Sequence, residues 1–77
     1  MSYQLIYTDI IRILSERDET PVEMLALKTG STSTDIIGFL QKLEKIHVVQ
    51  LLDDKKKVRI SNPHKIPTMT ELYALAG

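Results

Sequence analysis

Basic and hydrogen-bonding side chains gather in two short stretches of the chain. The first stretch, Ser33 to Lys45, carries hydroxyl, amide and ammonium groups, and the second, Lys55 to Arg59, carries four cations within five residues. Ammonium and guanidinium groups neutralise phosphates, whereas hydroxyl and amide groups pair with the edges of bases. The residues that could contact phosphates or bases are, with the neighbouring apolar Ile37 included, Ser33, Thr34, Ile37, Gln41, Lys42, Lys45, Lys55, Lys56, Lys57 and Arg59.

The residue patterns of catalysis and metal binding are absent from the sequence. The chain has no cysteine, so it lacks a thiol nucleophile and thiolate metal ligands, and it has no glycine-rich phosphate loop. Its two histidines, His47 and His64, lie seventeen residues apart with no short ligand motif near either one. We therefore expect a protein that is not an enzyme and that needs no cofactor or metal.

Length and composition predict one small domain spanning residues 1–77. The apolar fraction of 43% is typical of a globular chain. The lack of cysteine favours a reducing compartment, and the first residues lack the basic region and cleavage site of a secretory signal. No apolar run reaches the length of a membrane span. We expect a cytoplasmic protein with no membrane partner.

Charge is distributed unevenly along a chain whose net charge is zero. Residues 1–41 carry a net charge of −3, residues 42–65 carry +4, and Glu71 supplies the remaining −1. A net charge of zero is unusual for a nucleic-acid-binding protein. The cations nevertheless gather on the end of the first stretch and on the second, which favours contact with a polyanion there.

Two helices joined by a tight turn are predicted to position the first stretch. Gly30 suits the left-handed conformation that ends a helix, and Thr32 is placed to cap the next helix, with Asp35 completing a capping box. That helix runs from about Ser33 to Ile46, and His47 is placed to end it in a left-handed conformation. Its apolar face consists of Ile36, Phe39, Leu40 and Leu43.

The helix before this turn has a start signal of its own. Thr20 is placed to cap it, Pro21 to occupy its first position and Glu23 to complete a capping box. The sequence therefore predicts a helix from Pro21 to Thr29.

A first helix is predicted from Tyr3 to about Glu16. Its apolar face consists of Leu5, Ile6, Ile10, Ile13 and Leu14 at three- and four-residue steps. Tyr7 and Ile11 widen this face. They belong either to the core or to a contact with a second subunit, and the sequence favours the two interpretations equally.

A hairpin is predicted to position the second stretch. Two β-rich runs, 48–52 and 57–61, flank the polar residues Asp53 to Lys56. In the second run Val58 and Ile60 alternate with charged or polar residues, so one face packs and the other is charged.

The last part of the chain is predicted to be a connector followed by a short helix. Two prolines in residues 62–67 exclude a central strand. Thr68 and Glu71 form a further capping box at the start of a helix that carries Met69, Leu72, Tyr73 and Leu75. A helix this short is not stable alone, so we expect it to dock on the first helix or on a partner.

Several of these residues match a known sequence pattern. It begins with Leu-Ala, has a Gly four residues after the Ala and a Ser or Thr two residues after the Gly, and ends with Leu-x-x-Leu-Glu before a β-hairpin. The matching residues are Leu25, Ala26, Thr29, Gly30, Thr32, Ile36, Leu40, Leu43 and Glu44. In this spacing the chain resembles the winged-helix family of small prokaryotic or viral transcriptional regulators. The resemblance implies an α+β, mainly α fold with a three-helix core. It places the helix-turn-helix at about 21–46, a hairpin wing at about 48–61 and a short C-terminal helix at about 69–76.

The resemblance also implies binding to double-stranded DNA as a transcriptional regulator in the cytoplasm, associated with the nucleoid. The second helix of the helix-turn-helix would enter the major groove, with Ser33, Thr34 and Gln41 at base edges or phosphates and Ile37 at a thymine methyl. Lys42, Lys45 and the wing cations would contact the backbone or the minor groove. A homodimer through the first helix and the C-terminal helix is expected, and the end of the 17–19 link is expected to pair with the wing as a short strand.

One departure from the family pattern favours a different class of function. Ile37 and Gly38 occupy positions where such regulators often carry polar or basic residues. An exposed isoleucine beside a glycine suits a protein-binding face, and Gly38 would allow a phosphate or another helix to approach closely. The alternative interpretation is a winged-helix protein–protein interaction module within a larger complex.

Overall fold

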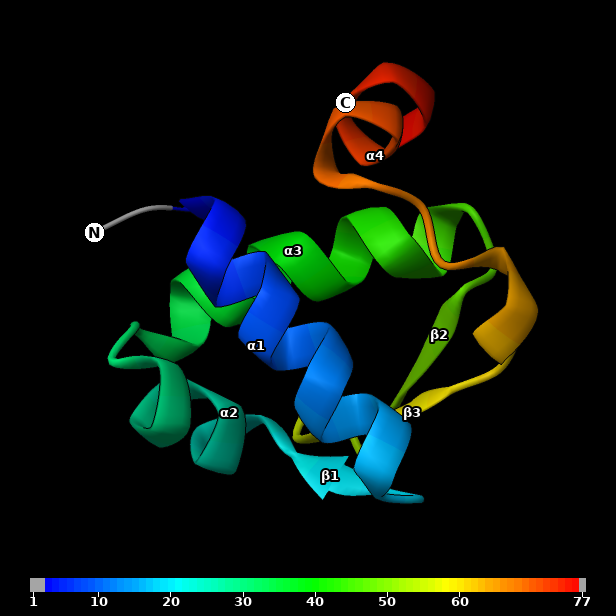
Figure 1. Ribbon diagram of the computed structural model, residues 1–77. Coiled ribbons are helices and arrows are strands. Elements are labelled where there is room, and N and C mark those ends of the chain that lie inside the picture. The colour runs from blue at the N-terminus through cyan, green and yellow to red at the C-terminus, as the bar shows by residue number, and fades with distance from the viewer. Residues whose placement is uncertain (1–2, 77) are drawn as a thin grey trace.

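The computed structural model describes residues 3–76, and within this range the chain forms four α-helices, one 3₁₀ turn and a three-stranded antiparallel sheet (Figure 1). The elements are α1 (Tyr3–Glu16), β1 (Thr20–Pro21), α2 (Val22–Thr29), α3 (Ser33–Lys45), β2 (Val49–Leu52), β3 (Lys57–Ile60), η1 (Pro63–Lys65) and α4 (Met69–Ala76). The fold is α+β and mainly helical, which confirms that part of the prediction.

The central strand of the sheet is β3, with β1 on one side and β2 on the other. β2 and β3 form a hairpin in which Leu52 lies opposite Lys57. On the other side of β3, Thr20 of β1 lies opposite Val58. A short strand was expected at the end of the 17–19 link, and the structure has it directly after the link, at Thr20–Pro21, where it joins the segment before α2 to the hairpin.

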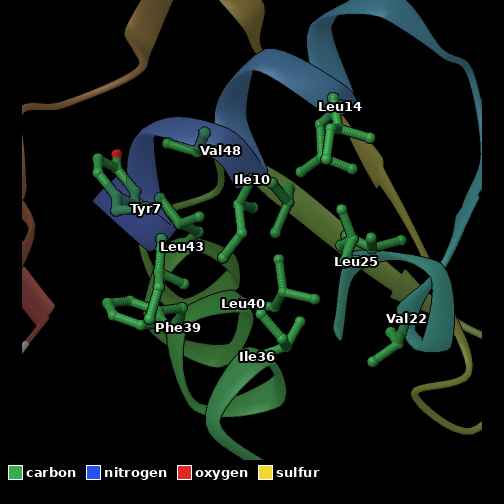
Figure 2. Packing of buried hydrophobic residues seen from close by; sticks show 14 of the residues in the cluster. Tyr7, Ile10, Leu14, Val22, Leu25, Ile36, Phe39, Leu40, Leu43 and Val48 are labelled. Carbon is green, nitrogen blue, oxygen red and sulfur yellow. The ribbon is translucent and has the colours of Figure 1, made fainter. Parts of the chain in front are cut away.

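A single hydrophobic core fills the space between α1, α2, α3 and the sheet (Figure 2). Its fully buried side chains include Ile10, Leu14, Leu25, Ile36, Leu40, Leu43 and Val58. Tyr7 is also buried, and Ile11 is partly buried against the same cluster. Tyr7 therefore belongs to the core and Ile11 packs against the outside of it, which agrees with the core interpretation of the two.

Leu5 does not belong to the core, contrary to the prediction. Its side chain is 64% exposed. At about 100° per residue, the five steps from Leu5 to Ile10 place the two side chains about 140° apart around the helix. Leu5 therefore lies on the solvent side of α1.

The turn between α2 and α3 forms by the predicted glycine and by the predicted threonine cap, whereas within the described residues Asp35 does not return the hydrogen bond that would complete a capping box. Gly30 adopts the left-handed conformation, with φ of 70°, at the end of α2. Thr32 caps α3, because its Oγ1 accepts a hydrogen bond from the amide of Asp35 at 3.1 Å.

α3 ends in a left-handed residue, as predicted, and is tied there to the sheet. His47 has φ of 64°, its amide donates to the carbonyl of Glu44, and the amide of Val48 donates to the carbonyl of Leu43. These two bonds form the Schellman arrangement that satisfies the last helical carbonyls. The carboxylate of Glu44 also accepts a hydrogen bond from the amide of Leu51 in β2, at 2.9 Å.

Thr20 does not cap α2, so the prediction of a capping box with Glu23 was wrong. Pro21 takes the capping position in an extended conformation, and no side chain caps the helix there. Pairing with β3 fixes Thr20 in a strand and leaves its side chain fully buried. Its Oγ1 has no hydrogen-bond partner in the part of the chain that the structure describes.

α4 docks mainly on α3, and not on the first helix as expected, with Leu72 fully buried. The predicted capping box is confirmed: Glu71 donates its amide to Thr68 Oγ1 at 3.1 Å, and Thr68 donates its amide to Glu71 Oε1 at 3.0 Å. The hydrogen bonds from Thr68 hold the pKa of the Glu71 carboxyl below its ordinary value. The Tyr7 hydroxyl donates to the carbonyl of Pro67 at 2.7 Å and so joins α1 to the segment that leads into α4.

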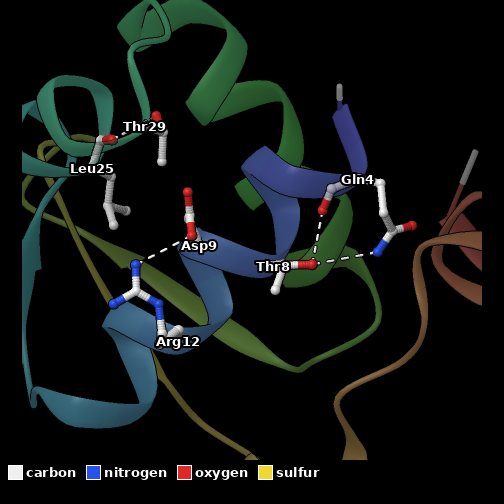
Figure 3. A network of polar contacts seen from close by, with 6 residues as sticks. All are labelled: Gln4, Thr8, Asp9, Arg12, Leu25 and Thr29. Carbon is white, nitrogen blue, oxygen red and sulfur yellow. Dashed lines mark hydrogen bonds and ion pairs between the residues drawn. The ribbon is translucent and has the colours of Figure 1, made fainter. Parts of the chain in front are cut away.

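The first prediction concerns the buried hydroxyl of Thr20. Thr20→Val should raise the free energy of unfolding by about 1 kcal/mol, because valine has nearly the same shape and removes a polar group that has no partner. Urea unfolding followed by circular dichroism measures the difference. The matched control is Thr29→Val, since the Thr29 hydroxyl is also buried but donates to the Leu25 carbonyl at 2.7 Å (Figure 3). An equal gain in both variants would contradict this explanation.

The second prediction concerns the hydrogen bond between Tyr7 and Pro67. Tyr7→Phe should lower the free energy of unfolding at neutral pH by about 1 to 2 kcal/mol, because the buried carbonyl of Pro67 loses its donor. Burial, with a smaller contribution from the charge of Glu71, raises the pKa of Tyr7 from 10.0 to about 12. The folded state therefore holds the phenol proton more tightly than the unfolded chain does.

This stabilisation by Tyr7 is complete below pH 10.0, the unfolded value, and is lost as the pH rises through about 12. The gap in stability between the wild type and Tyr7→Phe should therefore narrow across that window. Urea unfolding of the two proteins at increasing pH measures it. A gap that stays constant would show that the phenol proton is not held by the fold.

Candidate functional site

An open groove of about 520 Å³ lies between the start of α2, the start of α3 and the tip of the β2–β3 hairpin. It is lined by Pro21, Val22, Glu23, Ser33, Ile37, Asp54, Lys55, Lys56 and Lys57, and we call it the hairpin groove. The amide of Val22 donates to the carbonyl of Lys56 at 2.8 Å, so the hairpin tip is held against the first turn of α2. Both helices begin at the groove, because Val22 and Ser33, their first residues, are among the residues that line it.

The hairpin tip has an unusual backbone conformation. Asp53, Asp54 and Lys55 all have positive φ values, of 49°, 54° and 69°. Aspartate tolerates this left-handed region better than most residues, whereas lysine does not. The amide of Lys56 then donates to the carbonyls of Leu52 and Asp53, each at 3.1 Å, which closes the turn. The bond to Val22 draws this tight turn towards α2, so its lysines line the groove.

Charges of both signs line the hairpin groove. Three lysines face two carboxylates, those of Glu23 and Asp54, which leaves one net positive charge. Lys57 is also 3.6 Å from Asp53, but both side chains are about half exposed, so this ion pair contributes little to stability. Lys55 and Lys56 are therefore the cations that a ligand in the groove would meet first.

The solvent-facing side of α3 carries a separate polar stripe. Thr34, Gln41 and Lys45 are exposed, and steps of seven and four residues place them above one another on the helix. This stripe faces away from the core residues of α3 and next to Ile37. It combines a hydroxyl, an amide and an ammonium group on one accessible helix face.

The other flank of α3 is covered by α4. Thr34 and Lys42 line a hollow of about 320 Å³ there together with Tyr73. The ammonium of Lys42 lies 5.3 Å from the centre of the Tyr73 ring, within the range of a cation–π interaction. A Cβ added at Gly38 would meet no atom within 4 Å in the described part of the chain, so internal packing does not require this glycine.

The structure brings some of the predicted contacts together and separates others. The contacts gathered in the hairpin groove are Ser33, Ile37, Lys55, Lys56 and Lys57. Thr34, Gln41 and Lys45 form the α3 stripe, and Lys42 lies on the α4 side. Arg59 is exposed on β3 opposite Gln50 of β2.

The environment of Ile37 differs from the prediction. The spacing of α3 places it away from the core, yet it is half-buried and packs against the core cluster. On this side of α3, Ile37 forms part of the apolar floor of the groove together with Val22, and residues of the hairpin tip line the same groove.

Four groove residues were not predicted from the sequence as part of a site. They are Pro21, Val22, Glu23 and Asp54. The proline gives no such signal, because the residue before it favours an extended conformation that a strand residue and a helix-capping residue both adopt. No local signal places Glu23 near the hairpin lysines.

Within residues 3–76, no three histidine, aspartate or glutamate side chains lie where they could hold a metal ion together. Over the same range, no helix combines the length and the apolar character that crossing a membrane requires.

Comparison with known proteins gives no family for the chain: no protein-family model, no curated protein and no solved structure matches it. The functional interpretation therefore depends on the hairpin groove and the exposed face of α3.

Proposed function

We propose that the chain is a winged-helix domain that binds double-stranded DNA as a small transcriptional regulator. α3 would enter the major groove, and the hairpin tip would contact the adjacent backbone. The observation that carries the proposal is the convergence of Ser33 and Ile37 of α3 with three lysines of the hairpin in one groove. The order of the elements, with a short strand before α2 and a hairpin after α3, agrees with such a domain.

The dimensions and chemistry of α3 support its part in this proposal. An α-helix with its side chains is about 10 to 12 Å across, and the major groove of DNA is about 12 Å wide. The exposed stripe of α3 offers Thr34 and Gln41, whose side chains can pair with base edges, and Lys45, which suits a phosphate. The proposal thus assigns base contacts to the stripe and backbone contacts to the hairpin.

The proposal includes a homodimer and a cytoplasmic, nucleoid-associated location, and it includes no catalysis and no cofactor. Leu5 on α1 and Leu75 on α4 are 64% and 67% exposed, which supports association through these two helices. Leu72, also on α4, takes no part in this association, because it is fully buried within its own chain.

A second candidate function is a protein–protein interaction module. It is favoured by Leu27, which is 84% exposed on α2, and by the nearly balanced charge over an apolar floor in the hairpin groove. Failure of the protein to bind any duplex at low ionic strength would favour this candidate over the first.

The third prediction tests the hairpin lysines. Lys55→Gln combined with Lys56→Gln should weaken binding to every duplex. It should also make the plot of log affinity against log salt concentration shallower by about 0.9 for each phosphate that the variant no longer neutralises. Fluorescence anisotropy at several salt concentrations measures both effects. Lys65→Gln is the control, because Lys65 is exposed on η1 outside the groove. An unchanged slope in the double variant would remove the hairpin from the mechanism.

The fourth prediction tests base contacts by α3. Gln41→Ala should change the order of preference among duplexes of different sequence, by about 1 to 3 kcal/mol for the preferred site, and leave the salt slope unchanged because the substitution removes no charge. Gln50→Ala is the matched control, since Gln50 is equally an exposed glutamine but lies on β2. Competition binding with a panel of duplexes gives the order, and equal losses on all of them would contradict base contact by Gln41.

A further inference from the structure

The carboxylate of Glu23 has no role in capping α2, and it lies in the same groove as the hairpin lysines. Residues of β1, α2, α3 and the hairpin line this groove, so tertiary structure alone brings Glu23 together with Lys55 and Lys56. Asp54 adds a second carboxylate at the hairpin tip. An anion that enters the groove therefore meets both attractive and repulsive charges.

The attractive charges suit a phosphate group in particular. Lys55 and Lys56 are exposed and adjacent, and Ser33, at the start of α3, adds a hydroxyl-bearing residue to the lining of the same groove. Two ammonium groups and a hydroxyl match the oxygens of one phosphate, which accept hydrogen bonds and carry the charge. The side chains of Val22 and Ile37, which form the apolar floor, carry no charge and no hydrogen-bonding group for a second phosphate.

We propose that the hairpin groove binds one phosphodiester of the DNA backbone through Lys55, Lys56 and Ser33, and that Glu23 opposes this contact and so limits its strength. The inference rests on the proposed function, because the phosphate is one that belongs to DNA. Repulsion by Glu23 lowers affinity for every sequence equally, since phosphates carry no sequence information. Because the sequence-independent contact is weakened, base contacts made by α3 account for a larger share of the affinity for the preferred site than they would without Glu23.

The test compares two variants that make the same change of charge. Glu23→Gln removes the negative charge from the groove, and Glu71→Gln removes one from α4. Glutamine can replace glutamate in the capping box with Thr68, so the control variant keeps its helix cap. Circular dichroism confirms that both variants are folded, and anisotropy measures their affinity for two duplexes of different sequence.

Glu23→Gln should bind both duplexes up to about fivefold more tightly than the wild type, which is the size of effect that two like charges in close proximity have in water. This gain should shrink as salt is added, because salt screens exposed charges. Glu71→Gln should change the affinity by less than about twofold at salt concentrations near 0.1 M, where charges more than about 10 Å apart are largely screened. Asp54→Asn should change the affinity in the same direction as Glu23→Gln, and asparagine tolerates the left-handed backbone at that position.

Two results separate this inference from the function on which it rests. If the wild type binds a duplex and Glu23→Gln and Glu71→Gln have equal effects, the groove is not the phosphate site, while DNA binding stands. If neither the wild type nor any variant binds a duplex at low salt, the proposed function itself is wrong, and the inference falls with it.

An NMR titration distinguishes DNA phosphate from a free phosphate. Amide signals of Lys55, Lys56 and Ser33 should shift on addition of a duplex, and should shift little with inorganic phosphate at the same concentration of phosphate groups. Saturation of these shifts by inorganic phosphate alone would overturn the assignment to the DNA backbone and identify the groove as a site for small phosphate ligands.

Discussion

The pairing of β1 with β3 is the constraint on which the candidate site depends. Two residues of β1 lie beside β3, and the next amide, that of Val22, donates to Lys56 at the hairpin tip. These contacts hold the start of α2 against a turn that follows more than thirty residues later in the chain. Because α2 packs on α3 through the core, they also fix the distance between α3 and the hairpin lysines. Without this small ladder the hairpin tip and the helices would not share a groove.

Signals contained within a few residues were predicted correctly. Gly30, Thr32, His47 and Thr68 each end or begin a helix through contacts with residues at most five positions away, so the sequence around them is sufficient. Thr20 shows where this reasoning fails. Its local pattern is that of a helix cap, but pairing with a strand distant in sequence stabilises an extended conformation instead.

The residues of the hairpin groove were also predictable only in part. The hairpin lysines were found because basic residues at a turn between two β-rich runs are visible in the sequence. The opposing carboxylate of Glu23 was not, because its position relative to Lys55 depends on tertiary contacts between β1, β3 and the hairpin tip. A count of charges along the sequence placed Glu23 in the acidic part of the chain, whereas the fold places it among cations. The partial burial of Ile37 was missed for the same reason, because it depends on tertiary packing against the core cluster and not on the spacing of residues within α3.

The hydrogen bond between Glu44 and the amide of Leu51 protects one edge of the sheet from the addition of a strand from another chain. β2 is an outer strand, and an outer strand with free amides is a template to which another chain can add. The carboxylate of Glu44 occupies one of those amides, and at the opposite edge of the sheet Pro21 has no amide hydrogen to donate. Both edges are thus poor templates for strand addition. Addition of a second chain to either edge of the sheet is therefore disfavoured, and so is ordered aggregation through the sheet.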